Sequence, residues 1–231
     1  HKVCTYQTTC CKRQYHSYQK KDKLYRFILN AWFLSFRSII RLFTHNEYNH
    51  VSLSLDPELR QFVSFARYVK GVPLAGGFVK EPVERLLCDP GPLPVRIFRM
   101  DIPKEKANQL EDLFSLAGQR DTGLIYNSIS ALLTPIGLHL DVPGAYTCLE
   151  FASAVLDQRF RSLKALERYL EPMEILRGYL RELTADSGDR EGEFFRRRGF
   201  WGGTRDTGTH FLRLFCRTLR LSRCPDPIEK L

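Results

Sequence analysis

The sequence contains no stretch of about 20 uncharged apolar residues, which is the length that a membrane-spanning helix requires. Its most apolar run, residues 25–43, is interrupted by Arg26, Arg37 and Arg41. The run also lacks the short apolar core and small-residue cleavage site of a signal peptide. These absences favour the cytoplasm over a membrane or secreted location, but they do not identify the compartment.

Patterns that bind cofactors are missing as well. There is no glycine-rich phosphate loop, no dinucleotide fingerprint and no internal repeat. Cys4, Cys10, Cys11 and His16 lie close together, but adjacent cysteines without a matching second pair fit no common zinc spacing. The total of seven cysteines is odd, which favours reduced thiols over a disulfide framework. We therefore expect neither a metal ion nor an organic cofactor.

Positive charge is concentrated at the two ends of the chain. The 231 residues carry a net charge of +9. Residues 1–26 hold seven Lys and Arg against one Asp, and residues 181–231 hold eleven against eight acidic residues, so the middle has no net charge. A nucleic-acid enzyme needs a basic groove in its catalytic body, and this distribution argues against one.

Two distant stretches combine in a pattern that carries chemistry. In Tyr-Asn-His-Val-Ser-Leu-Ser-Leu-Asp, residues 48–56, apolar and polar residues alternate, which predicts a strand with His50 and two serines on one side. In Tyr-Thr-Cys-Leu-Glu-Phe-Ala-Ser-Ala-Val-Leu, residues 146–156, the spacing predicts a helix with Cys148 in its first turn. Small serines leave room for another element, so we expect this helix to cross the serine side and bring Cys148 to His50.

Such a pair would form an activated nucleophile. A free thiol titrates near ~8.5, and only the thiolate is a strong nucleophile. A helix N-terminus favours negative charge, and a neighbouring imidazole can take the thiol proton and return it to a leaving group. The alternative is structural: a cysteine on the apolar side of a helix is more often a small buried hydrophobe.

Several segments resemble the permuted papain-like cysteine hydrolases, the circularly permuted branch of the NlpC-type amidases. They are Ile-Arg-Leu-Phe-Thr, the His50 stretch, Phe-Val-Ser-Phe-Ala-Arg, Gly-Gly-Phe-Val-Lys-Glu, the Tyr126-Asn127 pair and the Cys148 stretch. The order of His before Cys is the permuted order. The resemblance implies that Cys148 is the nucleophile and His50 the general base of an enzyme that cleaves an amide or ester bond through an acyl-enzyme. The implied substrates range from cell-wall peptide cross-links to acyl groups on lipids.

The resemblance covers roughly residues 25–180 and suggests a division of the chain into three parts. We expect a basic, flexible segment at 1–24, the hydrolase domain at 25–183, and a basic extension at 184–231 that contains an amphipathic helix near 209–223. The expected fold is α+β, with a small antiparallel sheet and helices packed on one side of it.

The remaining elements follow from periodicity and from Gly and Pro. We predict strands at 25–29, 61–67 and 94–101, and loops around one short strand at 71–92. We predict helices at 33–43, after Pro103, at 126–138 with an interruption at Pro135, and over 161–183 with a break at 171–172.

The third catalytic residue stays open at this point. The family places a polar side chain on the strand after the His strand, and a one-residue change of register puts either Ser64 or Phe65 there. Glu81 is a more distant candidate, for which a solvated position is the stronger interpretation.

Three other functions compete with the hydrolase. A lecithin–retinol-type acyltransferase or lipid hydrolase would use the basic ends at a membrane, but its motif resembles Asn-Cys-x-His-Phe-Val, whereas this chain has Glu150 in place of that His. A binding module without catalysis is the second alternative, and nucleic-acid binding the third. For the C-terminal helix, we favour docking on the domain, with its arginines in water, over peripheral contact of the basic ends with a membrane.

Overall fold

A computed structural model describes residues 24–30 (backbone only), 48–56, 59–72, 74–88, 92–134, 138–183, 192–219 and 226–228. The predicted helix at 33–43, the N-terminal segment before residue 24 and its Cys–His cluster lie outside these residues.

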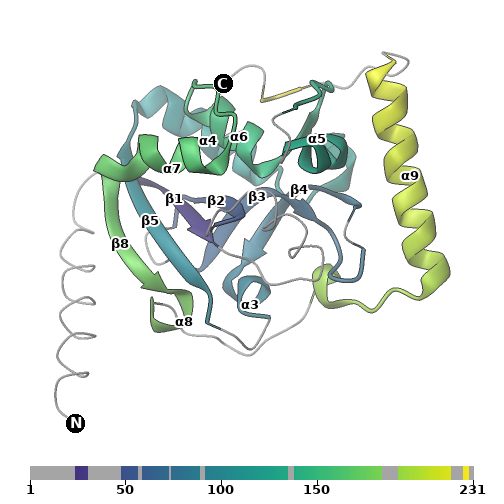
Figure 1. Ribbon diagram of the computed structural model, residues 1–231, viewed down its shortest axis with the longest axis horizontal. Helices are drawn as coiled ribbons and strands as arrows, with labels where there is room; N and C mark the ends of the chain where they lie inside the picture. Colours follow the sequence, from purple (N-terminus) through teal and green to yellow (C-terminus); the bar gives the residue numbers. More distant parts are fainter. Residues whose placement is uncertain are drawn as a thin grey trace, which may run out of the picture.

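The described strands form one curled sheet in the order β7-β6-β4-β3-β2-β1-β5-β8 (Figure 1). All neighbouring strands are antiparallel except β6 and β7, which are parallel. The sheet is thus larger than the small antiparallel sheet predicted, and it is mixed. The strands are β1 (Leu24–Asn30), β2 (His50–Ser54), β3 (Gln61–Arg67), β4 (Gly76–Pro82), β5 (Pro94–Asp101), β6 (Ile125–Tyr126), β7 (Ala145–Tyr146) and β8 (Glu174–Tyr179).

Three helices cover one face of the sheet, namely α4 (Lys104–Ser115), α6 (Cys148–Val155) and α7 (Leu163–Leu170) (Figure 1). The main hydrophobic core lies between them and the sheet. It includes Val51, Leu53, Phe65, Phe78 and Phe98 from strands, and Leu110, Leu113, Phe151, Ala152, Leu166 and Leu170 from the helices. Burial of this apolar surface is the dominant stabilising contribution to such a layered arrangement.

The opposite face is covered by the short helices α3 (Val83–Leu86) and α8 (Leu180–Leu183), so helices are not confined to one side as predicted. A second, smaller core lies there, built from Phe62, Val95, Ile97, Leu86, Leu180 and their neighbours. The α+β class is confirmed, and the Cys helix does contact the His strand.

The predictions for three segments need correction. Residues 71–92 contain the full strand β4 and helix α3 rather than loops around a short strand. The helix predicted at 126–138 begins later, as α5 (Ser128–Leu133), because Tyr126 pairs in the sheet and the Asn127 side chain caps the helix by accepting a hydrogen bond from Ser130 N at 3.0 Å.

The third segment is 161–183, where residues 174–179 are strand β8 and not helix. The break at Glu171–Met173 is present as a 3₁₀ turn. Beyond it the side chains alternate between half-buried and exposed, because the segment adds to the sheet beside β5. Long-range pairing therefore overrode the local helix preference.

The C-terminal helix α9 (Phe200–Thr218) is longer than predicted and runs along one side of the body (Figure 1). It is docked, as expected, but its orientation differs from the prediction. Arg217 is buried, whereas Leu212 and Phe215 are exposed. No helix within the described residues is both long enough and apolar enough to cross a membrane.

Candidate active site

The helix that carries Cys148 is fixed at its first turn by a capping box. Thr147 Oγ1 accepts a hydrogen bond from Glu150 N at 3.1 Å, and Glu150 Oε2 accepts one from Thr147 N at 2.6 Å. The sequence Thr-x-x-Glu before an apolar run is the signature of this motif. It makes Cys148 the first residue of α6, where backbone N–H groups have no partner within the helix.

Cys148 and His50 meet at the ends of their elements. His50 is the first residue of β2 and Cys148 the first of α6, and a hydrogen bond joins their side chains. The two residues are nearly buried, with exposed fractions of 9% for His50 and 8% for Cys148. The structure therefore brings the two predicted residues together.

The approach of α6 to the sheet differs from the prediction, because the helix packs on the apolar side of β2 and not on its serine side. The Phe151 ring contacts Phe65 and Phe78 at centroid distances of 5.5 and 5.2 Å. Burying these rings removes more apolar surface from water than a contact with serines would. The serine hydroxyls instead donate to Glu81 and to a backbone carbonyl, that of Gln61.

Glu81 from β4 completes the cluster, and the interpretation of this residue as solvated was wrong. Its side chain is fully buried, and Oε2 lies 3.0 Å from His50 Nε2. Oε2 also accepts a hydrogen bond from Ser52 Oγ at 2.8 Å. Because Nε2 is engaged by the carboxylate, Nδ1 is the ring nitrogen left for Cys148.

The second cation beside Glu81 is Arg85 from α3, which was not predicted. Its Nε lies 3.4 Å from Glu81 Oε1, and its NH2 donates to the backbone oxygen of Arg67 at 2.5 Å. Its guanidinium also stacks 4.1 Å from the centroid of the Phe194 ring, so the C-terminal extension covers this side of the cluster. Arg85 lies four positions after Glu81, and this spacing could have indicated the ion pair only if Glu81 had already been predicted to be buried.

Opposing charges control the protonation of His50 and Glu81, which form a buried pair. Burial alone would lower the pKa of His50, but the charge of Glu81 and the contact with Cys148 outweigh it and raise this pKa from 6.5 to about 10. Burial alone would raise the pKa of Glu81, but His50, Arg85 and Ser52 lower it from 4.5 to about 2. At neutral pH the pair is therefore an imidazolium beside a carboxylate.

Neither of the two candidates on β3, Ser64 and Phe65, is the group that orients the His50 ring. Ser64 donates its hydroxyl to Val51 O at 2.8 Å, and Phe65 packs against Phe78 and Tyr146 in the main core. The orienting group comes from one strand further along the sheet, since β4 lies beside β3.

Tyr126 on β6 is a further polar neighbour of the thiol. Its burial, together with the negative charges of Cys148 and Glu150, raises the pKa of its phenol. The phenol therefore stays protonated, so it can donate a hydrogen bond near Cys148.

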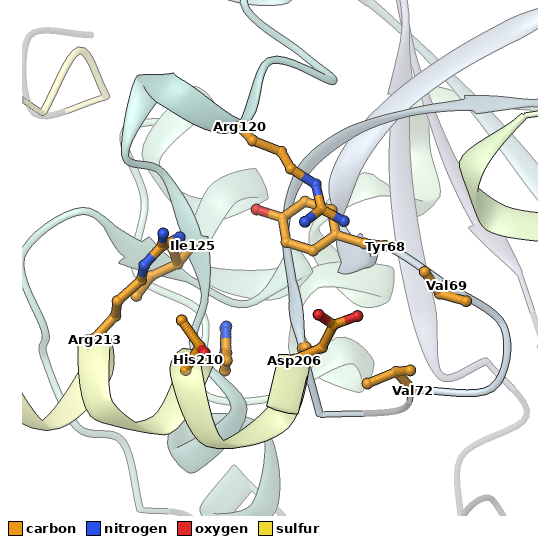
Figure 2. A pocket seen from close by; sticks show the side chains of 10 residues that line it. Tyr68, Val69, Val72, Arg120, Ile125, Asp206, His210 and Arg213 are labelled. Atoms are coloured by element: carbon orange, nitrogen blue, oxygen red, sulfur yellow. The ribbon is translucent and has the colours of Figure 1, made fainter. Parts of the chain in front are cut away.

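A separate cavity of about 90 Å³ lies beneath α9, and neither Cys148 nor His50 lines it (Figure 2). Tyr68, Arg120, Asp206, His210 and Arg213 are among the residues around it. Its charged groups hold the extension in place, since Arg120 stacks 4.3 Å from the Tyr68 ring centroid and forms an ion pair with Glu193. We therefore regard it as a seam between α9 and the body, distinct from the Cys–His–Glu cluster.

The capping box provides a first test of this geometry. Thr147→Ala removes the acceptor for Glu150 N and should lower the free energy of unfolding by about 1 kcal/mol, measured by urea denaturation. It should also slow alkylation of Cys148, because the first turn of α6 loosens. Ser162→Ala removes the matching cap of α7, where Ser162 Oγ accepts from Ala165 N. This control variant should lower the free energy of unfolding by a similar amount and leave the alkylation rate of Cys148 unchanged. Equal slowing of alkylation in both variants would show that the effect of Thr147 is not specific to the first turn of α6.

Comparisons with known proteins supply no family for this chain. No family model, no curated protein and no solved structure matches it. Its function is therefore inferred from the residues of the site.

Proposed function

We propose that the protein is a cysteine hydrolase that cleaves an amide or ester bond through a thioester acyl-enzyme. One observation carries the proposal: His50 lies between a buried carboxylate and a thiol at the start of a helix. A buried ion pair beside a cysteine is costly to maintain for packing alone. It is, however, the arrangement that nucleophilic catalysis needs, with a base next to the nucleophile and a third group that orients the base.

Each residue has a definite role in the proposed reaction. The Cys148 thiolate attacks the carbonyl carbon, and the carbonyl oxygen takes the negative charge, which the N–H groups at the start of α6 would stabilise. His50 donates its proton to the leaving amine or alcohol as the carbon–heteroatom bond breaks, which leaves a thioester on Cys148. His50 then removes a proton from water, whose oxygen attacks the thioester and releases the carboxylic acid. Glu81 keeps the ring oriented and stabilises its charged form.

The permuted papain-like family remains our proposal for the ancestry of this site. In support, the histidine strand precedes the cysteine helix in the chain, and the helix packs on a curled sheet that also carries the histidine. The orienting Glu81 lies on the Gly-Gly-Phe-Val-Lys-Glu segment, which is part of the resemblance. No metal or organic cofactor enters the proposed reaction.

The proposal is tested by brief alkylation at neutral pH with limiting iodoacetamide, followed by mapping of the modified cysteines. We expect Cys148 to react faster than the half-buried Cys216, although Cys148 is more buried, because a thiolate paired with an imidazolium is the reactive species. In His50→Ala the rate at Cys148 should fall by about 10²-fold or more, since the paired cation and base are lost. If Cys148 reacts no faster than Cys216 and the variant changes nothing, the hydrolase proposal fails and a binding module takes its place.

A further inference from the structure

One face of α9 holds the helix on the body through polar contacts as well as apolar ones. His210 Nε2 donates to Tyr126 O at 2.9 Å, and Arg217 NH1 donates to Gly144 O at 3.0 Å. Between them Leu214 is fully buried. These three residues are spaced by four and three positions, so they lie on one side of the helix. Figure 2 shows Asp206, His210 and Arg213 of α9 beside the cavity that separates the helix from Tyr68 and Ile125.

The opposite face of α9 carries large apolar side chains that face away from the body. Trp201, Leu212, Phe215 and Leu219 are spaced by eleven, three and four residues, which are close to whole numbers of helical turns. Leu212 is two positions from both His210 and Leu214 and therefore lies on the side opposite to them. The exposed fractions are 82% for Trp201, 62% for Leu212 and 59% for Phe215, and the adjacent Phe200 is 79% exposed. We call Trp201, Leu212, Phe215 and Leu219 the outer stripe.

Positive charge gathers at the Trp201 end of the outer stripe, and no acidic residue of α9 lies on this face. Arg205 lies one helical turn after Trp201, and Arg196 and Arg197 precede the helix; all three are exposed. The one acidic residue in the α9 sequence, Asp206, pairs with Arg198 at 3.4 Å and lines the cavity on the body side. Apolar side chains on one face, flanked by arginines and with a tryptophan at one end, are typical of helices that lie in a membrane interface.

We propose that α9 docks the protein on the surface of a bilayer rich in anionic lipids. The helix would lie in the plane of the interface, with the outer stripe among the upper acyl chains and its arginines against the lipid phosphates. A second copy of the chain is a poorer occupant, because two outer stripes in contact would bring their arginines together with no acidic residue on that face to neutralise them. This surface is independent of the proposed hydrolase chemistry, since it uses none of the residues of the Cys–His–Glu cluster.

The test is sedimentation of the full chain with sucrose-loaded vesicles of phosphatidylcholine, with and without about 30% phosphatidylserine. We expect binding to the anionic vesicles that weakens in high salt. Trp201→Ser combined with Phe215→Ser should weaken it by at least about tenfold, because the buried apolar area is lost. Arg196→Gln combined with Arg197→Gln should weaken binding to the anionic vesicles selectively.

A matched control comes from another exposed apolar residue, Ile175 on strand β8. Ile175→Ser should leave vesicle binding unchanged, and the two double variants should unfold at the same temperature as the parent protein. In a Trp32→Phe background, fluorescence of Trp201 should shift to the blue on anionic vesicles. The proposal is overturned if the chain does not sediment with anionic vesicles, or if the outer-stripe variant binds as well as the parent. It is also overturned if sedimentation velocity finds a dimer that the outer-stripe variant dissociates while vesicle binding is unaffected.

Discussion

Replacing Cys148 by alanine should abolish formation of the acyl-enzyme and leave only the residual acceleration that binding and the N–H groups of α6 supply. For an amide substrate the expected loss is roughly 10⁶-fold, as found when a single member of a catalytic triad is deleted. The reason is chemical: His50 and Glu81 have no nucleophile to activate once the sulfur is gone. The measurement does not require the natural substrate, because p-nitrophenyl acetate acylates activated thiols. The parent protein should show a burst of nitrophenolate and a mass increase of one acetyl group located at Cys148.

The controls separate this effect from general thiol reactivity. Cys216→Ala, on α9, and Cys88→Ala should keep both the burst and the adduct at Cys148, since Cys216 and Cys88 lie outside the Cys–His–Glu cluster. Cys148→Ser, which keeps the shape of the side chain, should fold like the parent and lose the burst. Retention of the burst in Cys148→Ala, or its loss in Cys216→Ala, would show that the proposed nucleophile is wrong.

Glu81→Gln should slow the reaction by up to about 10⁴-fold and move its alkaline limit to lower pH. The amide keeps the size of the side chain but removes its negative charge. Burial then acts on His50 without the opposing charge of Glu81, so the pKa of His50 falls from about 10. The imidazolium of His50 should therefore lose its proton at a lower pH in Glu81→Gln than in the parent protein. The measurement is the pH profile of the acylation rate. Glu84→Gln, which removes a carboxylate from α3, is the matched control and should leave the profile unchanged.

The same pair should govern how stability depends on pH. The pKa of Glu81 is lowered to about 2 from 4.5, so its contribution is complete above pH 4.5 and is lost as pH falls through 2. The pKa of His50 is raised to about 10 from 6.5, so its contribution is complete below pH 6.5 and is lost as pH rises through 10. The pair therefore stabilises the fold most between pH 4.5 and 6.5.

Replacing Glu81 by alanine should cost roughly 3–5 kcal/mol in that range, since it leaves buried His50 and Arg85 without their carboxylate. Urea denaturation at several pH values measures this cost, and a loss that does not shrink toward pH 10 would contradict the linkage.

Local patterns were sufficient to predict several elements of the candidate site. Alternation around His50 predicted β2, apolar spacing after Cys148 predicted α6, and Thr147 with Glu150 forms the box that begins this helix. These features depend on neighbours within a few residues along the chain, so the sequence contains them directly. The contact between Cys148 and His50 joins distant residues; the small serines beside His50 suggested it and the family resemblance strengthened it, but the predicted packing of α6 on the serine side was wrong.

The tertiary structure alone decided where the charged groups lie. A glutamate is ordinarily solvated, and Glu81 is buried because His50 and Ser52 from β2 and Arg85 from α3 together offset its desolvation. The same reason explains α9: Arg217 lies inward because backbone oxygens of distant loops accept its hydrogen bonds, and this turns Leu212 and Phe215 outward. Sequence by itself determined which residues could form strands, helices and a thiol–imidazole pair. Burial of a charge is decided by partners that only the folded chain brings together, because its free energy depends on contacts across the whole molecule.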